Sequence, residues 1–177
     1  MRFVTTRQLK RAATCAALFV LVLSVAMPAF FIPVFVTLAH PAQARMRLDR
    51  LTIEPAGGGA PHVFDIELAT TEQEKALGLM FRTALADTEG MLFPYANAQI
   101  MAMWMHNTYI SLDMVFIRSD GVIQRIEAQA EPLSDRVISS EAPVSAVLEL
   151  AGGAAGRLGI KPGDLVRHAA FDAAKKP

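Results

Sequence analysis

Five side chains in the middle of the chain are of types that could bind a polar ligand: Arg82, Trp104, Asn107, Thr108 and Asp113. The last four fall within one short segment, where polar residues interrupt two strongly apolar runs. A guanidinium and an amide can hold an anionic or sugar-like ligand through paired hydrogen bonds, and an indole face can stack on it. A buried polar group without a partner costs about 1–3 kcal/mol. Either a ligand or the protein itself must therefore satisfy these groups.

The same residues also have a purely structural interpretation. Arg82 and Asp113 could form an internal ion pair, and Asn107 and Thr108 could close a turn through hydrogen bonds between side chain and backbone. Buried polar networks of this kind often serve only to specify a fold. We therefore predict a ligand-binding site on the condition that the indole, guanidinium and amide groups meet in one place, and we assign no catalytic residue.

Methionines suggest a different chemistry. Met101, Met103 and Met105 alternate around Trp104, next to His106. Thioethers are soft ligands that suit Cu(I), but alternating methionines on a strand more often fill one face of a core. No histidines have the spacing of a metal site, and the chain lacks Gly-rich phosphate motifs and a G-x-S-x-G elbow. We expect no metal site and no cofactor, and keep copper binding as a third hypothesis.

The first 44 residues have the pattern of an export signal. Four basic residues precede an apolar run over 12–39, and an Ala-x-Ala sequence follows at 42–44. This pattern is typical of a secretory signal peptide cleaved after Ala44. Since the run is also long enough to span a bilayer, an uncleaved membrane anchor is the alternative. We expect an exported protein, periplasmic or secreted, that contacts the membrane only through this segment if it stays attached.

Charge and cysteine content limit the partners of the remaining residues. Residues 1–44 hold 4 of the 17 basic groups and none of the 17 acidic groups, which leaves 13 against 17, a net charge near −4. Nucleic-acid binding requires clustered Lys and Arg, so neither nucleic acid nor an anionic membrane surface is expected as a partner. The only cysteine is Cys15, so disulfides and thiolate ligands are excluded from the rest.

Alternation of apolar and polar residues predicts a sheet-dominated α+β domain, a small barrel-like mixed β domain. A capping box at Thr71–Glu74 predicts a short helix ending at Leu77, and Gly152-Gly153 opens a second short helix through Leu158. We assign 45–61 to a linker or edge strand, 62–168 to the domain and 169–177 to a disordered tail. The predicted strands are 48–54, 62–69, 91–93, 100–106, 114–117, 122–128, 144–150 and 165–168.

Six motifs in the same order resemble the DUF192 (UPF0127) family: Gly78-Leu-Met-Phe-Arg82, Glu89-Gly-Met-Leu-Phe93, Trp104-Met-x-Asn-Thr108, Leu112-Asp-Met-Val-Phe-Ile117, Glu131-Pro-Leu133 and Arg157-Leu-Gly-Ile-Lys-Pro-Gly-Asp164. The resemblance implies a compact β-rich domain, often exported, with no established activity. Two positions depart from the family pattern, with His106 in place of lysine and Ser111 in place of proline. A mechanism that requires the lysine would not carry over to this chain.

Our first functional hypothesis is an exported, non-enzymatic module of the envelope that binds an unknown small molecule or envelope component. The enzymatic alternative is a hydrolase acting on an envelope glycan or peptide through Asp113 or His106. A structure separates these hypotheses by showing which residues surround an open site and which are closed off by the protein.

Overall fold

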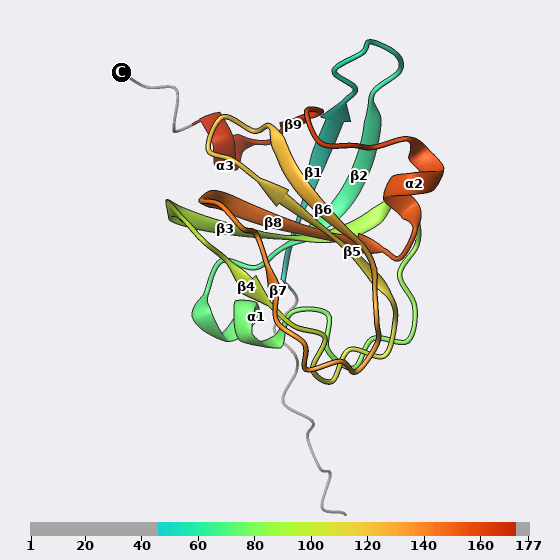
Figure 1. The fold of residues 1–177 in the computed structure, drawn as a ribbon, viewed down its shortest axis with the longest axis vertical. Helices are drawn as coiled ribbons and strands as arrows, with labels where there is room; N and C mark the ends of the chain where they lie inside the picture. The colour runs from blue at the N-terminus through green and yellow to red at the C-terminus, as the bar shows by residue number, and fades with distance from the viewer. Residues whose placement is uncertain (1–45, 173–177) are drawn as a thin grey trace, which may run out of the picture. The chain divides into compact units, whose positions relative to one another are not determined.

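The computed structural model describes residues 46–172, which form a sheet-dominated α+β domain (Figure 1). Two short strands form a small separate sheet, β4 Ala102–Met103 with β7 Ile138–Ser139. The main sheet has seven strands: β1 Arg47–Glu54, β2 His62–Leu68, β3 Glu89–Gln99, β5 Leu112–Ile117, β6 Ile123–Ala130, β8 Val144–Ala151 and β9 Leu165–Arg167. The described helices are α1 Glu72–Leu77, α2 Ala154–Leu158 and α3 Ala169–Asp172.

No helix within residues 46–172 has the length and apolar character needed to cross a bilayer. The predicted signal or anchor, residues 1–44, lies outside the described part of the chain, as do residues 173–177. The described segment begins just before β1, which pairs with both β2 and β9.

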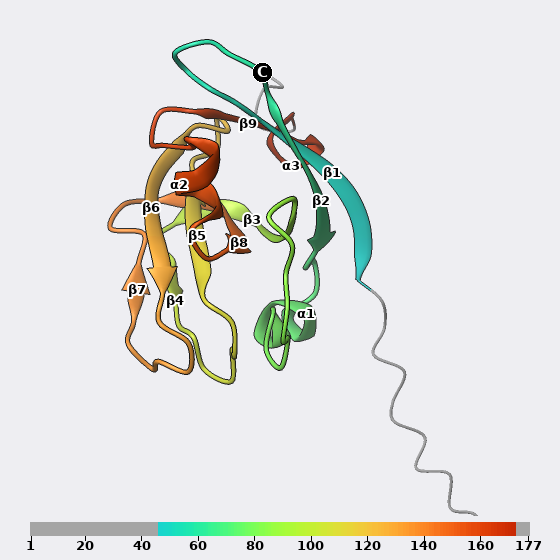
Figure 2. The same cartoon turned by 90° about the vertical axis from the view of Figure 1, so that its right-hand side faces the viewer.

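The main sheet curls into a half-barrel (Figure 2). Its strand order is β6-β5-β8-β3-β2-β1-β9, and β2 with β3 is the parallel pair among antiparallel neighbours. The hairpin that precedes β6 reaches β9 through a bridge between Val122 and Leu165, and the Val166 amide donates to the Gly121 carbonyl at 2.8 Å. The two outer strands of the sheet therefore approach each other, and the predicted barrel-like α+β fold is confirmed.

Each face of the sheet carries its own hydrophobic core. One core joins residues from all seven strands with α2 and α3, so it fills the curl. The other lies on the opposite face, beneath α1 and the small β4–β7 sheet. Because successive side chains of a strand point to opposite faces, β8 serves both cores. Ala146, Leu148 and Leu150 belong to the first core, while Val147 belongs to the second.

The two predicted helices are confirmed with their caps. The Thr71 hydroxyl accepts from the Glu74 amide at 3.2 Å, and the Glu74 carboxylate accepts from the Thr71 amide at 2.8 Å. Gly78 ends α1 with a φ of 50°, a region that favours glycine. The sequence does not predict α3, which occupies the first four positions of the segment assigned to the tail.

Two strand predictions are wrong in detail. The strand predicted to end at Phe93 continues as β3 to Gln99. Pro94 lies opposite Ala146 in the β3–β8 pair, but β2 pairs with β3 only as far as Leu92, so the missing N–H of Pro94 does not interrupt the β2–β3 ladder. The strand predicted over 100–106 shrinks to β4, since the chain turns at His106 and Asn107.

Candidate functional site

A cavity of about 390 Å³ lies between α1, β3 and β4, with β8 contributing one residue to its lining. We call it the Glu149 cavity, after that residue. Its lining includes apolar and aromatic groups, a few polar ones and the turn after α1: Glu72, Lys75, Ala76, Leu77, Gly78, Leu79, Met80, Phe93, Tyr95, Met101, Ala102, Met103, Trp104, Thr108 and Glu149. A concave, mostly apolar space with few polar groups is the usual form of a small-molecule site.

Glu149 is the chemically unusual group of this cavity. Strand β8 is buried on both faces. The alternation of side chains directs Glu149 toward the second core, to which Val147, Met91 and Met114 belong. The residue is only 5% exposed. Burial raises the pKa of the Glu149 carboxyl to about 8, and within residues 46–172 no hydrogen bond or basic group offsets that effect. At neutral pH the side chain is therefore mostly protonated, and it can donate a hydrogen bond into the cavity.

Sequence reasoning missed Glu149, although the sequence contained a signal. The residue is the one charged position in the apolar strand predicted at 144–150. An acid inside an otherwise apolar strand must be satisfied by the protein or by a ligand, as Asp113 must on β5.

The rim of the cavity is aromatic and carries one ion pair. The Trp104 indole is 54% exposed and stacks on His106, with ring centroids 5.1 Å apart. From α1, the Lys75 ammonium lies 3.2 Å from the Glu72 carboxylate and 4.5 Å from the centroid of the Tyr95 ring. Burial, and then the charges of the acids on this wall, raise the pKa of the Tyr95 phenol, which keeps it neutral.

Backbone hydrogen bonds hold in place the loop between β4 and β5, residues 104–111, which we call the Trp104 loop. Asn107 takes a φ of 52°, and its carbonyl accepts from the amide of Phe81 at 2.9 Å. The Thr108 amide donates to the Met105 carbonyl at 3.0 Å, and its hydroxyl donates to the His106 carbonyl at 3.2 Å. These bonds form a tight turn and fix the loop against the segment that follows α1. Trp104 and buried Thr108 both line the Glu149 cavity as a result.

Arg82 lines a different hollow. Its guanidinium forms an ion pair with Glu67 on β2 at 2.6 Å, and both side chains line a smaller space of about 290 Å³. The hydrogen bond from the Phe81 amide to the Asn107 carbonyl brings the backbone of Arg82 close to the Trp104 loop in space. The two predicted site groups nevertheless contribute to separate hollows.

Asp113 lies in the interior, with no exposed surface. One carboxylate oxygen accepts from the amides of Gln129 and Gly153 at 2.7 and 2.8 Å, and the other accepts from the amide of Ala155 at 2.9 Å. This carboxylate fixes the start of α2 and the end of β6. The ion pair between Arg82 and Asp113 considered above is therefore wrong.

Of the five residues predicted to bind a ligand, the structure thus places Trp104 and Thr108 on one cavity. Arg82 faces another hollow, Asn107 shapes a turn and Asp113 is closed off in the interior. Their role in ligand binding stays a prediction.

The methionines of the copper hypothesis are divided. Met101 and Met103 line the Glu149 cavity, whereas Met105 is fully buried in the core beneath it. Within residues 46–172 no three His, Cys, Asp or Glu side chains are grouped as a metal site requires. Copper binding through thioethers stays a prediction.

The fold and cavity define a small curled-sheet α+β domain with one buried carboxyl facing an apolar hollow. The DUF192 family, described as an uncharacterized ACR, matches residues 53–168. The chain belongs to the DUF192 family, which confirms the resemblance found in its motifs.

Two solved structures are similar to this chain. One, from Sinorhizobium meliloti 1021, is described provisionally as a transcription regulator; it is 40% identical, with a TM-score of 0.70 over 72% of this chain and 98% of that chain. The other, a protein of unknown function from Novosphingobium aromaticivorans DSM 12444, is 43% identical, with a TM-score of 0.67 over 73% of this chain and 90% of that chain. A comparison with curated proteins found no match.

Proposed function

We propose that this DUF192 domain is a non-enzymatic module that binds a small molecule in the Glu149 cavity. The observation that carries the proposal is a buried carboxyl that faces this space and has no partner among the described residues. Among residues 46–172 the fully enclosed side-chain atom without a hydrogen-bond partner is the Nε2 of His168, so the Glu149 carboxyl opens onto the cavity and is not sealed in the core. A buried polar group is normally hydrogen-bonded, and a ligand in the cavity can supply that bond to Glu149.

The groups named for a hydrolase give less support to catalysis than to binding. Asp113 is occupied by three backbone amides in the interior, so it cannot reach a substrate. His106 lies at the surface, where its Nδ1 is 2.8 Å from the Asp135 carboxylate. Glu149 remains, and a carboxyl with a raised pKa is also a candidate for proton transfer. No second group hydrogen-bonded to it within residues 46–172 completes an acid–base pair.

A variant that fills the cavity tests the proposal. Ala102 lines the cavity and is exposed, so Ala102→Phe adds volume at the opening without disturbing a core. A set of small cationic, neutral and anionic aromatic compounds is screened by ligand-observed NMR against the wild-type chain and the variant. We expect binding to the wild type that the variant loses. Ala128→Phe, at an exposed position on β6, is the matched control and should retain binding. Binding that survives Ala102→Phe, or no binding by any compound, would refute the proposal.

We also propose that the domain works outside the cytoplasm, as an envelope or secreted protein. The support is the N-terminal sequence alone, with its basic start, its apolar run over 12–39 and its Ala-x-Ala site. Cell fractionation and N-terminal sequencing of the purified protein test this. A mature chain that starts at Arg45 indicates cleavage, recovery of the intact chain with membranes indicates an anchor, and an intact chain in the cytosol would refute export.

The description of the Sinorhizobium protein as a transcription regulator does not extend to our proposal. Residues 45–177 carry a net charge near −4, with 13 basic against 17 acidic groups. Phosphate backbones are bound by clusters of basic side chains, and the arginines around the sheet are engaged with carboxylates, such as Arg157 with Asp87.

A further inference from the structure

A row of acids and methionines crosses the main sheet at one register. Glu67 of β2 pairs with Met91 of β3, and Met91 pairs with Glu149 of β8. Glu149 in turn pairs with Met114 of β5, and Met114 with Glu127 of β6. Residues that pair across neighbouring strands share a face of the sheet. The row therefore alternates acid and methionine across five strands, on the face that carries the Glu149 cavity.

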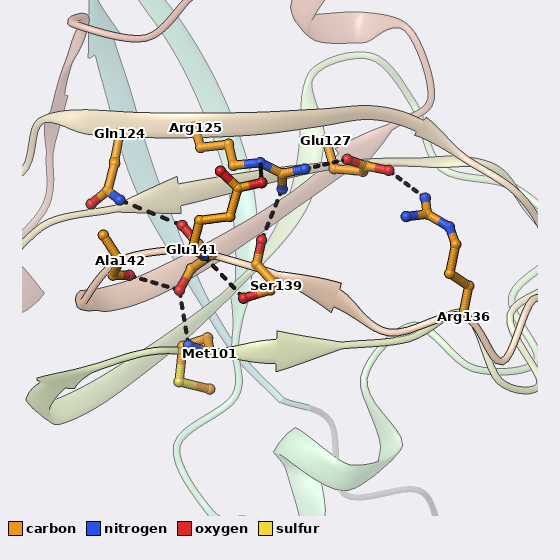
Figure 3. A network of polar contacts seen from close by, with 9 residues as sticks. Met101, Gln124, Arg125, Glu127, Arg136, Ser139, Glu141 and Ala142 are labelled. Atoms are coloured by element: carbon orange, nitrogen blue, oxygen red, sulfur yellow. Dashed lines mark hydrogen bonds and ion pairs between the residues drawn. The ribbon is translucent and has the colours of Figure 1, made fainter.

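The two outer acids of this row each have a cation. Arg82 lies 2.6 Å from the carboxylate of Glu67. Figure 3 shows the guanidinium groups of Arg125 and Arg136 on either side of Glu127. The Arg125 guanidinium lies 2.6 Å from the Glu127 carboxylate. The central acid, Glu149, is more deeply buried than either and has no cation within residues 46–172.

The other charges that line the cavity balance one another. On α1, Lys75 is paired with Glu72. From β3 the titratable group is the neutral Tyr95 phenol, and next to Trp104 the His106 ring is held by Asp135 at the surface. On β5 the neighbour of Glu149 is Met114. An ionised Glu149 would thus be the one unbalanced charge of the lining.

The walls favour a cation that has an apolar body. Phe93, Tyr95 and Trp104 line the cavity with aromatic rings, whose faces attract cations. The thioethers of Met101 and Met103 add soft, polarizable contacts. An anion would instead lie beside Glu149 and suffer like-charge repulsion, and it would find Lys75 already engaged with Glu72.

We infer that the Glu149 cavity takes a small organic monocation, an ammonium group on an apolar or aromatic body, and that Glu149 is its counter-ion. This inference rests on the proposed binding function and names its ligand class. The bound ligand completes the row, so that each of its three acids has at least one cationic partner. Since Glu149 is mostly protonated in the empty cavity near neutral pH, binding of the cation releases the carboxyl proton to solvent.

Three probes that share one body and differ in charge test the inference: benzylammonium, benzyl alcohol and benzoate. Binding to the full chain is followed by the fluorescence of Trp104, the only tryptophan, and by calorimetry. We expect benzylammonium to bind most tightly, with an affinity that rises about tenfold per pH unit from pH 6 to near pH 8 and then levels. Calorimetry in buffers of different ionisation enthalpy should show proton release of nearly one per ligand at pH 6.5.

Glu149→Gln keeps the size of the side chain and removes its charge. It should abolish the pH dependence and lower the benzylammonium affinity at pH 8 by at least about thirtyfold. Glu131→Gln changes an exposed loop glutamate and serves as the matched control that leaves both unchanged. Circular dichroism verifies that each variant is folded.

The outcomes separate this inference from the proposed function. If benzyl alcohol or benzoate binds more tightly than benzylammonium, or Glu149→Gln changes nothing, the cation inference is wrong while the binding cavity stands. Tighter binding of Cu(I) than of benzylammonium, measured under reducing conditions, would also overturn an organic cation. If no probe or screened compound binds to the wild-type chain, the proposed function itself fails.

Discussion

Replacing Glu149 by glutamine should stabilise the empty protein at neutral pH. In the folded chain burial raises the pKa of Glu149 to about 8, from the model-peptide value of 4.5. Between these two values the unfolded chain has lost a proton that the folded chain still holds. The free energy of unfolding therefore falls as the pH rises through this window. Below it both states are protonated and the carboxyl has no such effect.

The size of the effect follows from the two pKa values. One pKa unit corresponds to 1.36 kcal/mol, so the shift from 4.5 to about 8 costs the folded state about 1 kcal/mol at pH 5 and about 3 kcal/mol at pH 7. Above pH 8 the cost levels near 5 kcal/mol, as an upper figure. A glutamine at this position stays neutral and avoids the pH-dependent part.

Urea unfolding of the wild type and Glu149→Gln from pH 5 to pH 8 measures this directly. Subtracting the free energy of unfolding of one protein from that of the other cancels the pH dependence contributed by the other carboxyls. These include Asp87 and Glu127, whose pKa values are lowered chiefly by hydrogen bonds from arginines. We expect the glutamine variant to gain about 2 kcal/mol on the wild type between pH 5 and pH 7, about 1 M in the urea midpoint. A difference that does not change with pH would mean that Glu149 is ionised in the folded protein, and the reasoning about the cavity would be wrong.

Three further predictions concern the surroundings of the site. Asp113→Asn should lower the free energy of unfolding by about 3 kcal/mol in urea, because an amide cannot accept from all three backbone amides; a loss under 1 kcal/mol would contradict the capping role. Gly90→Ala should lower the free energy of unfolding by about 2 kcal/mol in a thermal melt, since the new Cβ would lie 2.7 Å from the Glu149 carbonyl oxygen. An unchanged melting temperature would mean that β3 and β8 move apart to admit the methyl group. Arg82→Gln should lower the free energy of unfolding by under about 1 kcal/mol and leave benzylammonium binding unchanged in a Trp104 fluorescence titration. Weakened binding would mean that the Arg82 hollow and the Glu149 cavity act as one site.

Local sequence signals predicted the fold well. The capping box at Thr71 and Glu74 fixes the start of α1 without help from distant residues, and Gly78 fixes its end. Apolar alternation placed most strands of the sheet. It failed over 100–106, where the alternation is real but the chain turns at Asn107, whose positive φ no periodicity reveals.

The site was harder to predict because ion-pair partners come from distant strands. Arg82, in the segment between α1 and β3, pairs with Glu67 of the neighbouring strand β2, whereas the carboxylate of Asp113 on β5 accepts from backbone amides at the start of α2. The sequence shows that Asp113 must be satisfied, but not by which amides. The sequence marks Glu149 as an acid in an apolar strand, but the sheet order alone places it in the same row as two acids that have arginines.

The row of acids and methionines also bears on why a costly residue occupies this position. The neighbours of Glu149 on both sides are fully buried methionines, so a third methionine would continue an apolar face and avoid the desolvation of a carboxyl. Elsewhere the domain satisfies its buried acids, with Asp113 accepting three amides and Asp164 two. A fold that pairs its other buried acids and leaves one unpaired at the wall of a cavity has the local inconsistency expected of a functional site. On the function proposed above, a cationic partner for the carboxylate would recover the stability lost in the empty state.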